Sequence, residues 1–163
     1  MTEYTVLGVL AEGPTHGFAI AKELTADAEL GRIYTVHRSL VYRALDRLVA
    51  NGLAAPSQVE TSEAGPNRIV HRISSRGRAV LRSWLEAPVS HVRDLRIEFL
   101  LKLTLIRRSG RSPVALIATQ RLSLESTLDA LDQPGPADPV DLWRQHNART
   151  AAAYLDELET IFG

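Results

Sequence analysis

The sequence predicts a mostly α-helical protein that carries one small β-hairpin. Apolar residues recur at helical spacing along most of the 163 residues, and a strand pattern occurs between residues 53 and 73. Apolar residues make up 45% of the chain and charged residues 23%, which is ordinary for a globular protein and excludes wholesale disorder. A chain of this length holds one domain of ordinary size, or a small domain with a helical extension.

Two short helices are expected at the start of the chain. Residues 4–11 are predominantly apolar, and the breaker pair Gly13 and Pro14 ends this first helix. A second helix is expected to begin after Thr15, whose hydroxyl is a suitable N-cap, and to stop at Gly31. The residues expected on its buried face are Phe18, Ile20, Ala21 and Leu24.

The third helix has the clearest pattern in the chain. Thr35 is expected to cap it, no breaker interrupts residues 36–51, and Gly52 stands where a C-terminal glycine belongs. At about 100° per residue, apolar side chains gather within an arc of roughly 140° and polar side chains occupy the opposite arc. One face therefore docks on a core while the other is presented outward. The apolar set is Leu40, Val41, Ala44, Leu45 and Leu48, and the polar set is Arg38, Ser39, Tyr42, Arg43 and Asp46.

A hairpin is predicted next. Residues 53–59 and 68–73 are its two strands, and Pro56 marks the first as an edge strand because proline cannot donate to a ladder. The loop between the strands, ETSEAGPN, has turn composition. In the second strand, the alternation sets Ile69, His71 and Ile73 on one face and Arg68, Val70 and Arg72 on the other.

A fourth helix completes the order of elements in the first half of the chain. Ser74 or Ser75 caps this helix, and Pro88 ends it. Helix, helix, helix, hairpin, helix is the order of a winged helix-turn-helix. We therefore predict such a domain over residues 1–87 and a second, helical domain over residues 88–163.

Three further helices are predicted in the second half. Each has a narrow apolar stripe, so together they leave an apolar seam that another subunit or the first domain must cover. Glu98 and Lys102 are placed as a favourable i,i+4 ion pair. Trp84 and Trp143 are expected to be core or interface anchors. The helices span residues 90–107, about 112–131 and 140–162, with the linker QPGPADP before the last.

The charge distribution favours a phosphate-bearing partner. The whole chain has 19 basic and 19 acidic residues, so its formal net charge is zero. Between residues 31 and 82, however, nine arginines stand against Asp46, Glu60 and Glu63, which gives this stretch a net charge of +6. Concentrated basic charge of this kind suits the backbone of a nucleic acid.

Other features speak against an enzyme, a metal site or a membrane protein. The chain has no cysteine, which excludes disulfide frameworks, thiolate zinc sites and cysteine nucleophiles and fits a reducing compartment. Its five histidines are scattered without metal-binding spacing, and P-loop, GxGxxG and GxSxG motifs are absent. No apolar run could span a bilayer, and the N-terminus lacks a signal-peptide layout. We expect a cytoplasmic, non-enzymatic protein without a cofactor.

An ordered set of segments resembles the PadR-type transcriptional regulators. LGVLAEGPTHGFAIAKEL is similar to that family's first two helices, SLVYRALDRLVANGL to its recognition helix, and RIVHRISSRGRAVLRSWL to its second wing strand and fourth helix. Further on, EFLLKL, DLWRQH and YLDELE resemble the longer C-terminal domain that one branch of the family uses for dimerisation. The chain departs from the pattern at Phe18 and His71, where tyrosine is common, and Glu60 and Glu63 in the wing would repel phosphate.

Seven residues are candidates for DNA contact. A recognition helix directs its N-terminal side chains at base edges in the major groove, and a wing can hold the backbone beside it. The amides that open the second helix could bind a phosphate oxygen. The alternatives are a solvated helix face, a solvent-facing strand and a packed or surface histidine. The candidates are Arg38, Ser39, Tyr42 and Arg43 on the third helix, Arg68 and Arg72 on the wing, and His16 before the second helix.

Together, the patterns and the resemblance predict a sequence-specific regulator that binds double-stranded DNA. The resemblance implies a homodimer, more often a repressor, and two recognition helices then suit a pseudo-palindromic operator. Regulators of this family often respond to small molecules, so an effector of unknown identity is a further candidate partner. Two alternatives stay open, namely a winged-helix module that binds protein and a small-molecule sensor that does not bind DNA directly.

Overall fold

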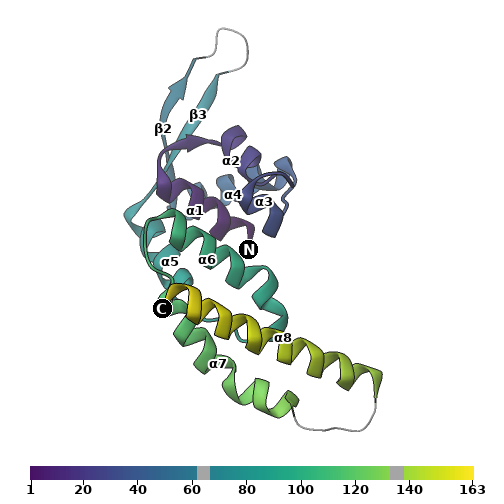
Figure 1. Cartoon of the computed structure of the whole chain (residues 1–163). Coiled ribbons are helices and arrows are strands. Elements are labelled where there is room, and N and C mark those ends of the chain that lie inside the picture. Colours follow the sequence, from purple (N-terminus) through teal and green to yellow (C-terminus); the bar gives the residue numbers. More distant parts are fainter. Residues whose placement is uncertain (62–66, 133–137) are drawn as a thin grey trace. The chain divides into compact units, whose positions relative to one another are not determined.

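The computed structural model describes residues 1–61, 67–132 and 138–163, which form two units (Figure 1). The N-terminal unit is Met1–Leu85 and the C-terminal unit is Glu86–Gly163. The described residues are predominantly helical and include one three-stranded sheet. The predicted mostly α-helical fold with a hairpin wing is therefore confirmed.

In its described part, the N-terminal unit consists of five helices and the three-stranded sheet. Helix α1 packs against α4, and strand β3 contacts both α1 and α2. Burying a leucine or isoleucine side chain stabilises a fold by about 1.5–3 kcal/mol, so the fully buried set forms a substantial core. The helices are α1 (Thr2–Glu12), α2 (Gly17–Glu23), α3 (Glu29–Ile33), α4 (Arg38–Ala50) and α5 (Ser75–Glu86). The buried set includes Leu7, Leu10, Ile20, Leu24, Leu30, Leu45 and Leu48.

The start of α2 differs from the sequence-based prediction. Thr15 does not cap this helix, because Thr15 and His16 form the short strand β1 (Thr15–His16). The cap is His16, whose Nδ1 accepts a hydrogen bond from the Ala19 amide at 3.0 Å. Pairing with β3 holds these two residues in an extended conformation, so the helix begins only at Gly17.

The predicted second helix is also two helices rather than one. Helix α2 ends at Glu23, and α3 begins at Glu29 after a turn. Gly31 does not stop a helix but lies inside α3, where an added Cβ would come within 1.7 Å of the Thr25 carbonyl oxygen. Glycine at this position therefore permits α3 to approach the turn closely, which is a packing requirement and not a helix stop.

The sheet has the strand order β1-β3-β2, with antiparallel pairs throughout. Strands β2 (Ala54–Glu60) and β3 (Arg68–Ile73) form the predicted hairpin. Strand β2 lies at an edge, as Pro56 predicted, and its register shifts between Pro56 and Gln58. Glu63 lies outside the described residues.

Burial along β3 does not follow the predicted alternation of two faces. Val70 is 1% exposed, whereas Ile69 is 53% exposed. Ile69 pairs with the exposed Val59, and both lie beyond His16, the last residue of β1 to pair with β3. Figure 1 shows the outer part of the hairpin extending past the helices of its unit.

Helix α5 is capped by Ser74, one of the two predicted caps. The Ser74 hydroxyl oxygen accepts a hydrogen bond from the Gly77 amide at 2.9 Å. Trp84 of this helix is 9% exposed and stacks on Tyr4 of α1, with ring centroids 4.8 Å apart and planes 5° apart. The stacked pair fixes α5 against α1, which confirms Trp84 as a core anchor.

The described part of the C-terminal unit contains a 3₁₀ helix and three α-helices. The predicted helix over residues 90–107 is wrong as one element, because a 3₁₀ turn comes first and α6 begins only at Glu98. Val92 and Leu95 are three residues apart, a spacing that a 3₁₀ helix also places on one side, so periodicity could not reveal the break. None of the described helices is long and apolar enough to cross a membrane. The elements are η1 (Val92–Arg96), α6 (Glu98–Arg108), α7 (Val114–Asp132) and α8 (Pro139–Phe162).

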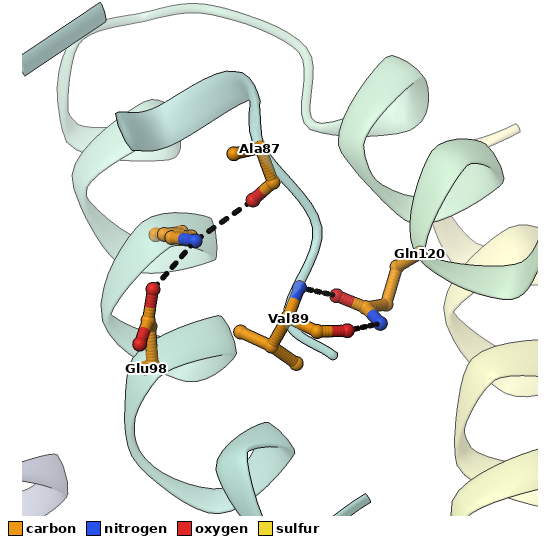
Figure 2. A network of polar contacts seen from close by, with 5 residues as sticks. Ala87, Val89, Glu98 and Gln120 are labelled. Carbon is orange, nitrogen blue, oxygen red and sulfur yellow. Dashed lines mark hydrogen bonds and ion pairs between the residues drawn. The ribbon is translucent and has the colours of Figure 1, made fainter. Parts of the chain in front are cut away.

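Two buried polar side chains hold the backbone at the start of the C-terminal unit (Figure 2). Gln120 of α7 accepts a hydrogen bond from the Val89 amide at 2.7 Å and donates one to the Val89 carbonyl at 2.9 Å. The Lys102 ammonium of α6 donates to the Ala87 carbonyl at 2.7 Å and lies 2.8 Å from a Glu98 carboxylate oxygen. The predicted Glu98–Lys102 pair is confirmed, although Lys102 is only 1% exposed. We call Lys102 and Gln120 the backbone clamp.

Helix α8 packs against α7 through only part of its length. Ala151, Leu155 and Leu158 are buried, as the predicted stripe requires. Trp143, by contrast, is 69% exposed and is not a core residue of this unit. Val140 and Ile161 are exposed as well, so both ends of α8 present apolar side chains to solvent. Most of the predicted linker before α8 lies outside the described residues.

Candidate functional site

Helix α4 begins and ends through local interactions. His37, not the predicted Thr35, is its N-cap, and the His37 Nδ1 accepts from the Ser39 amide at 3.4 Å. Thr35 instead donates its hydroxyl to the Gly31 carbonyl at 2.8 Å, which occupies it in the preceding turn. At the other end Gly52 has a φ of 67°, so the predicted C-terminal glycine is confirmed.

The two predicted faces of α4 are present, with one exception. All five predicted polar side chains are exposed, and four of the five apolar ones are buried. Leu40 is the exception at 44% exposed, because it lines a shallow surface hollow with Met1, Glu3 and Arg47 rather than the core. The exposed set is Arg38, Ser39, Tyr42, Arg43 and Asp46, and the buried set is Val41, Ala44, Leu45 and Leu48.

Guanidinium groups from two separate elements lie over the Phe18 ring. The Arg38 guanidinium of α4 lies 5.1 Å from the ring centroid of Phe18, and the Arg68 guanidinium of β3 lies 5.2 Å from it. Arg38 also lies 5.5 Å from the Tyr42 ring centroid and donates a long hydrogen bond, 3.4 Å, to the Tyr42 hydroxyl. These distances are in the range of cation–π attraction. We call Phe18, Arg38 and Arg68 the arginine cluster.

Phe18 was predicted to lie on the buried face of α2, and this is wrong because its side chain is 43% exposed. The other three residues predicted for that face, Ile20, Ala21 and Leu24, are buried. Apolar spacing alone does not identify an aromatic ring that faces cations instead of a core. The sequence feature that could have indicated an exposed Phe18 was the basic charge of the surrounding elements. The helical spacing of Phe18 itself did not indicate it.

His16 has a structural role that limits what else it can bind. Its Nδ1 accepts from the Ala19 amide, so a neutral imidazole carries its proton on Nε2. Nε2 lies 3.5 Å from an Arg68 nitrogen and 3.8 Å from a Glu60 carboxylate oxygen. The Nε2 proton suits the carboxylate better than the guanidinium, since the guanidinium is itself a donor.

Gly17 permits α4 to approach the start of α2. A Cβ added at Gly17 would lie 2.8 Å from Cε1 of Tyr42 and 3.1 Å from Cδ1 of Leu45. The Tyr42 ring therefore occupies the space that any other residue at this position would fill. In the sequence His-Gly-Phe, the first residue caps a helix, the second admits an aromatic ring, and the third contacts two arginines.

A surface hollow of about 420 Å³ lies between α4 and β3. It brings together four of the seven predicted site residues, while Ser39, Arg43 and Arg72 lie exposed outside its lining. Asp46 also lines the hollow, and its carboxylate favours a partner that offers hydrogen-bond donors as well as anionic groups. The four predicted residues in the lining are His16, Arg38, Tyr42 and Arg68.

The C-terminal unit has a separate, open surface hollow of about 400 Å³ beside η1 and α8. Leu95, Leu100 and Ala151 give it apolar walls, and Arg96 and Tyr154 add polar groups. Burial raises the pKa of the Tyr154 hydroxyl above its ordinary value of 10.0, so this phenol stays neutral at physiological pH. Among residues 1–61, 67–132 and 138–163, no group of three histidine, aspartate or glutamate side chains could hold a metal ion.

Comparisons with known proteins gave one family match in the N-terminal unit and similar solved structures over nearly the whole chain. Residues 6–83 match the model of the transcriptional regulator PadR-like family. A comparison with curated proteins gave no match. Bacillus subtilis PadR, solved in complex with operator DNA, is 19% identical, with a TM-score of 0.49 over 99% of this chain and 98% of that one. The protein smu.1604c of Streptococcus mutans UA159 is 18% identical, with a TM-score of 0.48 over 97% of this chain and 96% of that one.

The matched segment runs from α1 to α5 and includes every strand of the sheet. It therefore contains the exposed face of α4, the hairpin and the arginine cluster. Over residues 6–83, this chain is similar to the PadR-like family of transcriptional regulators.

Proposed function

We propose that this protein is a transcriptional regulator that binds double-stranded DNA with α4 as its recognition helix and the β2–β3 hairpin as its wing. One observation carries the proposal: the exposed face of α4 begins with Arg38, whose guanidinium contacts the same Phe18 ring as the Arg68 guanidinium of the wing. Guanidinium groups can donate two parallel hydrogen bonds to guanine or to phosphate, which suits both base reading and backbone contact. The family match of residues 6–83 supports the same function.

The proposal assigns different contacts to the helix and to the wing. The N-terminal side chains of α4 would reach base edges in the major groove, where a bidentate arginine–guanine contact contributes about 1–3 kcal/mol of discrimination. Arg68 and Arg72 would hold the backbone from the wing. His16 keeps its Nδ1 for the α2 cap, so only its Nε2 proton remains for a phosphate oxygen. The α4 side chains are Arg38, Ser39, Tyr42 and Arg43.

We also propose that the active form is a homodimer, with residues 1–87 as the DNA-binding domain and residues 88–163 as the dimerisation domain. The support is the set of exposed apolar side chains on α7 and α8, which a monomer leaves in water at a cost in free energy. Two recognition helices related by a twofold axis suit a pseudo-palindromic operator with half-sites about 34–36 Å apart. The exposed set is Leu122, Val140, Leu142, Trp143 and Ile161.

We further propose that the protein is a cytoplasmic repressor whose DNA binding is controlled by a small molecule. A repressor needs only to occupy its operator, and an effector must bind the two conformational states with different affinities to release it. The open surface hollow lined by Leu95, Ala151 and Tyr154 has a volume in the range of small-molecule sites and supports this part of the proposal. Screening metabolites for a rise in unfolding temperature, followed by operator-binding assays, tests it.

Selection of bound duplexes from a random pool is the direct test of DNA binding. We expect an enriched motif with twofold symmetry, bound with an affinity that falls steeply as salt rises. Arg38→Ala combined with Arg43→Ala should weaken binding to that motif by at least about 30-fold, since each arginine loses a base or phosphate contact. Arg111→Ala combined with Arg121→Ala removes the same charge from the C-terminal unit and should leave binding within about threefold of the unmodified protein.

Two outcomes would contradict the proposal. One is a folded protein that ignores duplexes of every sequence at low ionic strength, which would favour a protein-binding module instead. The other is unaltered binding by the Arg38→Ala/Arg43→Ala variant. Sedimentation equilibrium tests the homodimer separately, and Trp143→Glu should shift it toward monomer because a carboxylate would enter an apolar interface.

A further inference from the structure

Phe18 presents a large apolar ring to solvent instead of packing it in the core. Its side chain is 43% exposed, and the guanidinium groups of Arg38 and Arg68 lie over its ring. Arg38 belongs to α4 and Arg68 to β3, and the two arginines are 30 positions apart in the sequence. A single ring therefore contacts one cation from each of the two elements that the proposed function assigns to DNA.

The backbone that carries Phe18 is well fixed. His16 caps the N-terminal end of its helix, and Ile20 and Ala21 of the same helix are buried in the core. The cap residue itself pairs with Val70 of β3, so the ring is anchored to the strand that carries Arg68. An aromatic ring has only two rotatable side-chain bonds, whereas an arginine has four, so the ring can restrain the two longer side chains.

We propose that Phe18 is a positioning residue that holds Arg38 of the recognition helix and Arg68 of the wing in the orientation that DNA requires. This inference rests on the proposed function and adds to it the coupling of helix and wing through one ring. Guanidinium groups that are already ordered lose less conformational entropy when they bind. Removing the ring therefore weakens both contacts without removing either charge.

The first test replaces Phe18 and measures affinity for the selected duplex with the full-length protein. Phe18→Leu keeps an apolar side chain but lacks the π system. Each exposed cation–π contact corresponds to about two- to fivefold in an equilibrium constant, so the loss should be about 5- to 20-fold. Phe18→Tyr and Phe18→Trp keep a ring and should restore binding to within about threefold of the unmodified protein. A residue with a merely structural role would not show this recovery by aromatic residues alone.

The second test asks whether Arg38 and Arg68 act together. Both arginines contact the same ring, so the Arg38→Ala/Arg68→Ala double variant should lose less affinity than the product of the two single losses. We expect this difference to be at least about threefold. Arg43 and Arg72 are also exposed on α4 and β3, but their guanidinium groups are not among the described contacts of the Phe18 ring. This control pair should be additive to within about twofold.

The third test examines the free protein, and together with the binding measurements it separates this inference from the proposed function. In the free protein, side-chain proton resonances of Arg38 and Arg68 should be shifted upfield by the ring current of Phe18, and Phe18→Leu should abolish both shifts. Binding by the unmodified protein together with undiminished binding by Phe18→Leu overturns the inference and leaves the proposed function intact. Failure of the unmodified protein to bind any duplex overturns both, whatever the resonances show.

Discussion

The polar side chains of the arginine cluster and of the backbone clamp differ in burial, and therefore in what they can do. In the N-terminal unit, the guanidinium groups of Arg38 and Arg68 are exposed around a ring that is itself 43% exposed. In the C-terminal unit, Lys102 and Gln120 are 1% and 0% exposed, and their hydrogen bonds end on the backbone of residues 87 and 89. The arginine cluster therefore keeps hydrogen-bond donors available to a partner, whereas the donors of the backbone clamp are already used in hydrogen bonds within the protein.

Burial decides the energetic consequence of losing each group. An exposed guanidinium that is removed is replaced by water, so the folded state loses little. A buried hydrogen-bonding partner that is removed leaves a backbone group without water or a protein partner, which costs about 1–3 kcal/mol for each group. The N-terminal cluster should therefore govern binding and the C-terminal clamp should govern stability. Each prediction below tests one side of this division.

The largest effect on stability is expected from Gln120→Leu. This change deprives both the amide and the carbonyl of Val89 of their partners inside the protein, so we expect a loss of about 2–5 kcal/mol in the free energy of unfolding. Urea unfolding followed by circular dichroism measures it. Thr119→Ala, at the neighbouring exposed position of the same helix, is the matched control and should change stability by less than about 1 kcal/mol. Equal stability of the Gln120→Leu protein would show that the clamp is dispensable.

Lys102→Met should have the next largest effect. Methionine fills the space of the lysine stem, but it leaves the Ala87 carbonyl and the Glu98 carboxylate without the ammonium group. The Glu98 side chain is 28% exposed, so water can partly replace its partner, and we expect a smaller loss of about 1–3 kcal/mol. Adding Glu98→Gln to this variant removes the carboxylate charge that the Lys102 ammonium faces and should recover part of the loss. A Lys102→Met protein that is more stable than the original would mean that desolvation of the ammonium outweighs its contacts.

The elements that sequence reasoning identified well are those whose pattern is local. Helix α4 is 13 residues long and strongly amphipathic, and Val41, Leu45 and Leu48 are buried as their spacing predicts. Gly52 could be identified as its C-terminal glycine because a positive φ is a local backbone requirement. Pro56 likewise indicated an edge strand through its own missing donor.

The features that sequence reasoning missed depend on residues far along the chain. His16 is a cap and a strand residue only because it pairs with Val70, 54 positions later. Phe18 is exposed because arginines from α4 and β3 face it, and no local pattern contains that information. Lys102 is paired with Glu98 at a spacing typical of a solvated helix surface, yet it is buried. Non-local packing decided all three positions, and two of them belong to the candidate site.

Gly17→Ala tests the close approach of α4 to α2, with a smaller expected effect. The added methyl group would meet the Tyr42 ring at 2.8 Å, but this ring is 39% exposed and can swing toward solvent. We therefore expect a loss of only about 1 kcal/mol in stability and a clear loss of affinity for the selected duplex, because Tyr42 leaves its place beside Arg38. Gly13→Ala is the control, since an added Cβ there meets no atom within 4 Å. Affinity changes of equal size in the two variants would exclude a role for the Tyr42 position.

The smallest effect on stability is expected from Arg43→Ala, and this null result is the sharpest test of the division between the two regions. Arg43 is exposed on the outward face of α4, so its removal should change the free energy of unfolding by no more than about 0.5 kcal/mol. The same change should weaken DNA binding, and the accompanying salt dependence distinguishes the kind of contact. If Arg43 contacts a phosphate, the slope of log affinity against log salt should fall by about 1. If Arg43 instead reads a base, the slope should stay nearly constant and discrimination at one base position should relax, by about 1–3 kcal/mol. A loss of stability as large as that of Gln120→Leu would show that this exposed arginine is part of the fold, and would remove the contrast between a cluster that binds and a clamp that stabilises.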